Sequence, residues 1–142
     1  MNARLLVVIA IALTGCASVA TGQTYAEEEM LILAVAVTKV SAAAEANLVY
    51  GAPSDSLSDV EFLAQSVAHD PGLLAPFSGY RIEATRQSGH AAILMCSSDG
   101  AIALLEDAGC TAAMDRHRWR DDPKGPCAFT IDLAQVCSAV SN

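Results

Sequence analysis

The first pattern along the chain predicts a helix that begins near Thr24 and continues to about Tyr50. Thr24 stands three residues before Glu27, the spacing of a capping box, and three glutamates occupy the first turn, where the helix dipole favours acids. Good helix formers fill the rest, and a Gly-Ala-Pro sequence ends it. The apolar run at residues 30–37 is too short to span a membrane. We therefore expect this helix either in the core or at an interface with a partner.

A second helix is predicted from Ser58 to Ala68, with Ser58 and Glu61 as another capping-box pair. Apolar residues recur in it at helical spacing: Val60, Leu63, Ala64 and Val67. An Asp-Pro-Gly turn ends the helix. The connector that follows is expected to pack through three apolar side chains: Leu73, Leu74 and Phe77.

Beyond residue 80 the pattern changes to period two, which is typical of strands. Residues 80–85 alternate and predict a half-exposed strand, and Ser88 with Gly89 forms a hairpin turn signal before the apolar strand at 90–96. A third strand is predicted at 101–105, although its Ala and Leu content also suits a helix.

A fourth short strand is predicted near the C-terminus. Phe129, Ile131 and Leu133 alternate there with polar residues, unless Asp132 instead caps a final helical turn. The elements together predict an α+β fold, in which two N-terminal helices pack on one face of a three- or four-stranded antiparallel sheet. The chain has 142 residues, enough for one domain, which we place at residues 24–142.

Residues 1–15 have the features of a secretory signal peptide. Arg4 precedes an apolar run that is too short to cross about 30 Å of hydrocarbon. The sequence Leu13-Thr14-Gly15-Cys16 follows, and it resembles the lipobox of bacterial lipoproteins. The resemblance implies that Cys16 is lipidated, that the leader is cut before it, and that the new amino terminus is acylated. The alternative is ordinary cleavage after Ala20 and release as a soluble protein.

Lipidation would attach the chain to a membrane through three acyl chains, with residues 16–23 as a short tether. Two or more acyl chains hold a protein stably at a membrane, whereas one does so only marginally. Ala17 follows the lipidated cysteine in place of the Asp that retains enteric lipoproteins in the inner membrane. The expected location is therefore the cell envelope, facing the periplasm, with the outer membrane favoured over the inner membrane.

Five cysteines are present, an odd number, and committing Cys16 to lipid leaves an even set of four. These four are expected to form disulfides in an oxidising compartment: Cys96, Cys110, Cys127 and Cys137. Their spacings of 14, 17 and 10 residues lack the paired spacing of structural zinc sites, so no metal or other cofactor is predicted. Three pairings are open, and our favoured hypothesis nests Cys110–Cys127 inside Cys96–Cys137.

The net charge of −8 limits the classes of partner. Removing Arg4 with the leader leaves 7 basic against 16 acidic residues, a charge of −9. Nucleic-acid binding requires a basic face, so we exclude it. Electrostatic attachment to anionic lipid is unfavourable for the same reason.

One basic segment interrupts this acidic chain between Cys110 and Cys127. It contains five residues that form a hypothetical partner-binding loop: Arg116, His117, Arg118, Trp119 and Arg120. Trp and Arg are enriched at binding hot spots, which favours an envelope protein as the partner. The alternative is a solvated connector whose Trp folds back over the core, with Arg–Asp pairs of little energetic value.

No common catalytic motif, such as GxSxG, HExxH or a P-loop, is present. Asp115 and His117 would share a face of a strand, and an Asp-oriented His is one part of a hydrolytic site, but no nucleophile is marked beside it. Glu106 and Asp107 would point to opposite faces, as a solvated strand end. We therefore expect a non-catalytic binding, accessory or inhibitor module of the envelope, with a small periplasmic hydrolase that uses His117 and Asp115 as the alternative.

Overall fold

The computed structural model describes residues 24–112 and 115–138. The predicted signal peptide, Cys16 and the tether at 16–23 lie outside the described residues. The elements follow in this order: α1 (Glu27–Ala46), the π-helical turn η1 (Asn47–Gly51), α2 (Asp59–Ser66), the 3-10 helix η2 (Pro71–Phe77), β1 (Arg81–Gln87), β2 (His90–Cys96), β3 (Ala103–Ala108), β4 (Asp115–Arg116), the 3-10 turn η3 (Arg118–Arg120) and α3 (Leu133–Ser138).

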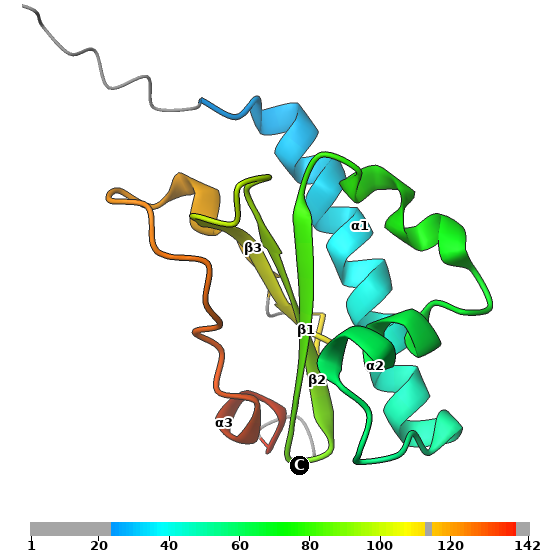
Figure 1. The fold of residues 1–142 in the computed structure, drawn as a ribbon. Helices are drawn as coiled ribbons and strands as arrows, with labels where there is room; N and C mark the ends of the chain where they lie inside the picture. Colours follow the sequence, from blue (N-terminus) through cyan, green and yellow to red (C-terminus); the bar gives the residue numbers. More distant parts are fainter. Residues whose placement is uncertain (1–23, 113–114, 139–142) are drawn as a thin grey trace, which may run out of the picture.

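The strands form one antiparallel sheet in the order β1-β2-β3-β4. The helices α1 and α2 cover one face, and α3 with the extended segment before it covers the other (Figure 1). The predicted α+β fold, with two N-terminal helices on an antiparallel sheet and a disulfide-pinned C-terminal region, is therefore confirmed.

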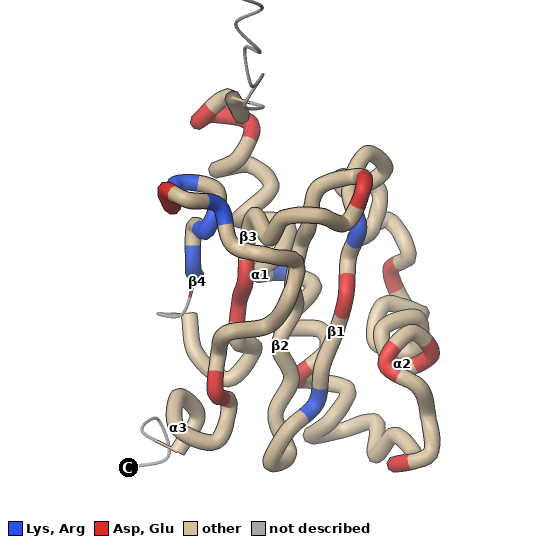
Figure 2. Tube along the Cα trace, turned by 60° about the vertical axis from the view of Figure 1, so that its left-hand side comes forward, with Lys and Arg blue, Asp and Glu red and all other residues tan. Residues whose placement is uncertain are grey.

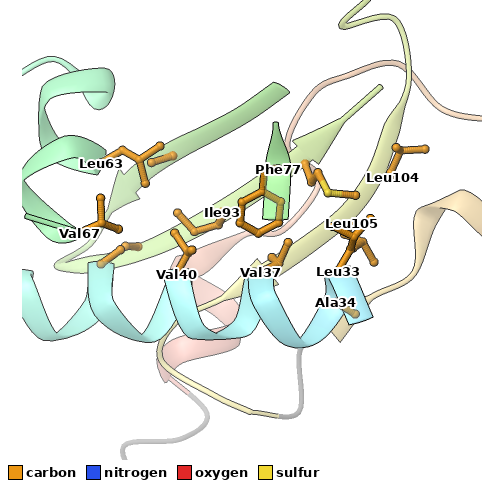
Figure 3. Packing of buried hydrophobic residues seen from close by; sticks show 14 of the residues in the cluster. Leu33, Ala34, Val37, Val40, Leu63, Val67, Phe77, Ile93, Leu104 and Leu105 are labelled. Carbon is orange, nitrogen blue, oxygen red and sulfur yellow. The ribbon is translucent and has the colours of Figure 1, made fainter. Parts of the chain in front are cut away.

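The core lies between α1 and the sheet. One side of α1 faces the strands, because its buried residues recur at spacings of three and four. These residues are Met30, Leu33, Val37, Val40 and Ala44. Figure 3 shows Val37 and Val40 pointing toward Ile93 of β2, with Phe77 of η2 beside them. Each such aliphatic side chain contributes about 1.5–3 kcal/mol by leaving water. One side of α1 is therefore a core element.

The ends of the two helices differ in how well they match the sequence pattern. Ser58 and Glu61 form the predicted capping box. The Glu61 N–H donates to Ser58 Oγ at 3.3 Å, and the Ser58 N–H donates to Glu61 Oε2 at 2.8 Å. The capping box predicted at Thr24 is wrong, because α1 begins after Ala26, which has no capping side chain. Thr24 thus lies two residues before the N-cap position of α1.

The apolar stripe predicted for α2 is only partly correct. Leu63 and Val67 are buried, but Val60 and Ala64 face solvent, and Phe62 takes the central place. The helix has only 8 residues and packs on β1, where the Arg86 guanidinium lies 4.8 Å from the centre of the Phe62 ring. Phe62, and not Val60, therefore fills the space between α2 and the sheet.

The predicted hairpin is present. Ser88 and Gly89 both adopt positive φ, 55° and 79°, as the two central residues of a type I′ hairpin turn do. The third strand forms but begins later than predicted, at Ala103. Its pairing with β2 shifts between Leu105 and Ala103, so that Leu104 is an extra residue and joins the same core as Leu105. The strand consequently extends through the acidic pair that follows.

The fourth strand predicted around Phe129 is wrong. Ile131 and Leu133 are buried against the back of the sheet, as the alternation requires, but this segment forms no ladder. The backbone N–H groups of Thr130 and Ile131 donate instead to the Glu106 carboxylate. The alternative holds at the end of the segment, where Asp132 accepts from the Gln135 N–H at 3.3 Å as α3 begins.

Candidate functional site

The four described cysteines form two disulfides, Cys96–Cys127 and Cys110–Cys137, each with 5.7 Å between its Cα atoms. The predicted oxidised set is confirmed, but the favoured nested pairing is wrong, because the two bridges are interleaved along the chain.

The sheet explains this pairing. Cys96 ends β2 beside Ala103, whereas Cys110 follows β3 at the opposite end of the same strand pair. The segment after η3 returns beside the start of β3, where Ile102 pairs with Pro126, and this places Cys127 next to Cys96. The segment then follows the back of the sheet to the far end, where α3 places its cysteine next to Cys110.

Arg118, predicted as part of a binding loop, points into the protein. Its guanidinium is buried, 3.4 Å from Glu106 Oε2, and it donates to the Ala128 carbonyl at 2.5 Å and to the Pro126 carbonyl at 3.2 Å. These contacts fasten the C-terminal segment to the sheet. Arg118 therefore has a structural role and is not an exposed contact for a partner.

The other members of the loop differ in exposure. Trp119 packs on the core as the alternative expectation described, and its buried Nε1 has no hydrogen bond within the described part of the chain. Arg120 lies over the Trp119 ring at 5.0 Å and reaches Glu27 of α1 at 2.6 Å. Arg116 donates to the Thr130 hydroxyl at 2.8 Å. Of the predicted loop, Arg116 and Arg120 remain at the surface.

His117 forms the predicted pair with Asp115. Its Nε2 lies 2.9 Å from Asp115 Oδ2, and β4 with the turn after it places both side chains near the surface. Neither residue lines the surface hollows that lie along α1, α2, η2 and β1. The Asp115–His117 pair is thus oriented but lines none of these hollows.

Glu106 is fully buried, contrary to the solvated strand end predicted for it. Its carboxylate accepts from the N–H groups of Thr130 and Ile131 at 2.5 and 2.7 Å and from the Thr130 hydroxyl at 2.7 Å, with Arg118 beside it. Figure 2 shows the acids of β3 beside the basic residues of β4 and η3. The sequence signal was an acidic pair followed within 12 residues by a basic cluster.

Asp107 is buried on the opposite face, toward α1, where its Oδ2 accepts from the Ser41 hydroxyl. Its Oδ1 is buried without a hydrogen bond of ordinary geometry among the described residues. Burial raises the pKa of Asp107 to about 6, the Ser41 hydroxyl lowers it in part, and the negative charge of Asp115 raises it further. The interface between α1 and the sheet therefore contains a poorly compensated carboxyl group.

An apolar surface lies on the solvent side of α1. We call the side chains of Leu31, Ile32 and Val35, which are 43%, 63% and 58% exposed, the α1 strip. Ile32 also borders a surface hollow of about 490 Å³ beside Pro76. The segment Glu27–Gly51 is long and apolar enough to cross a membrane by length and composition, but its other side forms the core. The α1 strip is therefore exposed apolar surface on a helix whose opposite side lies in the core.

A group of side chains able to bind a metal lies where α1, β2 and α3 meet. One ring nitrogen of His90 and the sulfurs of Cys110 and Cys137 all lie within 4.8 Å of one another. Glu45 of α1 approaches His90 Nδ1 with its Oε1 at 2.6 Å. Sequence reasoning missed this group because its members are far apart along the chain.

No protein-family model, curated protein or solved structure matches this chain. Its function therefore has to follow from its own residues and their geometry.

Proposed function

We propose that this protein is an exported lipoprotein, anchored in the cell envelope through acyl chains on Cys16, that acts as a non-catalytic binding module. The observation that carries the proposal is the use of its cysteines. Four of the five pair with one another, so that Cys16 alone is left for other chemistry. Two disulfides also suit an exported domain, because the reducing environment of the cytosol keeps cysteine thiols unpaired.

The anchor would hold the start of α1 close to the membrane. About ten residues separate Cys16 from Glu27. A flexible tether of this length has a root-mean-square span of about 20 Å. The α1 strip begins one turn beyond Glu27 and would therefore lie within reach of other proteins on the same membrane.

The α1 strip is the surface that best fits a protein partner. Contiguous apolar side chains at a surface mark sites of interaction more often than isolated ones do. Each aliphatic side chain of the strip would contribute about 1.5–3 kcal/mol on burial. Arg120 lies at the edge of this surface through its contact with Glu27, so one member of the predicted basic loop would still take part.

Intact mass spectrometry of the protein isolated from the envelope tests the anchor. We expect a chain that begins at Cys16 and is heavier than its residues by the mass of a diacylglyceryl group and a further acyl chain. A mature chain in which Cys16 is bare, or from which it is absent, would contradict the anchor and leave the binding role to be judged separately.

In-cell photo-crosslinking tests the binding role. A photoreactive residue at Leu31 should give a specific protein adduct, and Ile32→Lys should reduce its yield at least fivefold. Val60→Lys is the matched control, because Val60 is 79% exposed and lies on α2, outside the strip. The role is wrong if the probe at Leu31 captures no more protein than a probe at Val60.

A small hydrolase that uses His117 is the alternative, and the 2.9 Å contact with Asp115 is what favours it. A survey of ester, amide and phosphoester substrates would show turnover that His117→Ala abolishes. Equal turnover by the two proteins, or none, would reject this alternative.

A further inference from the structure

The group around His90 has the composition of a metal site. The two cysteine sulfurs are bonded to each other at 2.03 Å, and one imidazole nitrogen lies within 4.8 Å of both, so reduction must separate the sulfurs before they can bind one ion. Ligand atoms around a tetrahedral zinc ion lie about 3.5–4 Å apart, since zinc binds sulfur at about 2.3 Å and nitrogen at about 2.0 Å. Cys137 is buried, whereas His90 and Cys110 are half-buried, so the group can be reached from one side.

Glu45 holds the imidazole in a fixed orientation. Its Oε1 lies 2.6 Å from His90 Nδ1, and its Oε2 accepts from the Ala91 N–H at 2.9 Å. Histidines that bind metals nearly always make such a contact with a carboxylate, which fixes the ring and raises its basicity. The fold therefore places an imidazole, held by a carboxylate, beside the Cys110–Cys137 bridge.

The other disulfide offers a comparison within the same molecule. Near Cys127 lies the side chain of Glu83, whose Oε1 is 4.0 Å from the cysteine sulfur. Among the described residues, the Cys96–Cys127 bridge belongs to no group of three metal-ligating side chains. Within the described part of the chain, a histidine with a carboxylate partner accompanies the Cys110–Cys137 bridge and not the Cys96–Cys127 bridge.

We propose that Cys110 and Cys137, once reduced, bind one Zn²⁺ ion together with His90, with Glu45 as the positioning residue. A dithiol reductant transfers two electrons and two protons to the Cys110–Cys137 bond and becomes a disulfide itself. Each cysteine thiol then releases its proton to solvent as its sulfur binds the ion. Water completes the tetrahedral coordination on the exposed side. Oxidation of the Cys110–Cys137 bridge therefore prevents zinc binding, and its reduction permits zinc binding.

Zinc titration of the protein isolated from cells tests this assignment. The protein is reduced with a phosphine, freed of reductant without oxygen, and titrated with Zn²⁺ against a chromophoric chelator. We expect one equivalent to bind to the reduced protein and none to the oxidised protein. His90→Gln should weaken binding 10- to 100-fold, and Glu45→Gln should weaken it about tenfold.

The double variant Cys96→Ser/Cys127→Ser is the matched control and should keep one equivalent, with an affinity within about threefold of the unaltered protein. Circular dichroism of each reduced sample separates binding from folding. If reduction unfolds the chain, Zn²⁺ should restore the fold of the unaltered protein and of the control, but not that of His90→Gln. Failure of the reduced protein to bind Zn²⁺, or equal behaviour of His90→Gln and the unaltered protein, would overturn the assignment.

Discussion

Glu106 and Asp107 are adjacent in β3 and both are buried, but their carboxylates are compensated to different degrees. Glu106 receives three hydrogen bonds from Thr130 and Ile131 and has Arg118 beside it. Asp107 accepts from one hydroxyl and leaves its other oxygen unsatisfied within the described residues. A buried charge is tolerated only when it is paired and hydrogen-bonded, so the two residues should respond oppositely to substitution.

Removing the cation beside Glu106 should destabilise the protein. We expect Arg118→Met to lower the free energy of unfolding by about 3 kcal/mol, because it leaves a buried carboxylate without its cation and frees two backbone carbonyls. Arg116→Met, at an exposed arginine, should change it by less than about 0.5 kcal/mol. Urea unfolding of both variants gives the comparison, and equal midpoints would contradict the role of Arg118.

Asp107 should make stability depend on pH. Its pKa is about 6 in the folded protein against 3.8 for an ordinary Asp, so as pH rises between these values the unfolded chain loses its proton first. Stability should therefore fall across this window, by about 3 kcal/mol when complete.

The variant Asp107→Asn cannot ionise, so it should be more stable than the unaltered protein at about pH 7.5 and close to it at about pH 3.5. Urea midpoints measured across this range test the prediction. Asp55→Asn, at an exposed aspartate, is the control and should keep the fall with pH. A flat profile for the unaltered protein would refute the assignment.

At the scale of elements, the contact between α1 and the end of β3 is unusually close. A Cβ added at Gly109 would lie 2.4 Å from the Ser41 carbonyl oxygen and 2.8 Å from Glu45 Cβ. Both neighbours belong to α1, so a larger residue can be accommodated only if the helix moves away from the sheet. Glycine at this position therefore sets the helix–sheet distance.

We expect Gly109→Ala to lower the free energy of unfolding by about 1–3 kcal/mol through this overpacking. Gly79→Ala is the matched control, because an added Cβ there meets nothing within 4 Å. Thermal unfolding of the two variants should show a lower midpoint for Gly109→Ala alone. Similar midpoints would mean that α1 adjusts at no cost.

The elements whose signals are local could be predicted from the sequence. The capping box at Ser58, the turn at Ser88 and the apolar strand that follows all depend on neighbouring residues, and all are present. The segment around Phe129 has a strand's alternation, but a side chain far away in the sequence, Glu106, takes its N–H groups. Both the disulfide pairing and the group around His90 depend on which ends of strands meet, which periodicity does not specify.

At the scale of the whole molecule, the two bridges fasten the C-terminal segment at both ends of the sheet. Their loops span 31 and 27 residues, and each should stabilise the protein by about 3.5 kcal/mol through loss of entropy in the unfolded chain. The loops overlap, so the two contributions should not add independently.

Peptide mapping without reduction should recover Cys96 joined to Cys127 and Cys110 joined to Cys137. The variant Cys96→Ala/Cys127→Ala should unfold at a lower urea concentration than the unaltered protein, by the equivalent of about 3–4 kcal/mol. A recovered Cys110–Cys127 peptide would contradict the interleaved arrangement.

The interleaved order has a consequence for how the chain matures. A chain that emerges N-terminus first presents Cys96 and Cys110 to an oxidant before either native partner, because Cys127 and Cys137 both lie beyond the whole sheet in the sequence. Oxidation in order of appearance therefore joins the wrong two thiols and delays the fold until exchange corrects them, over seconds to hours without a catalyst. Efficient production of this protein should accordingly require a disulfide isomerase and not merely an oxidant.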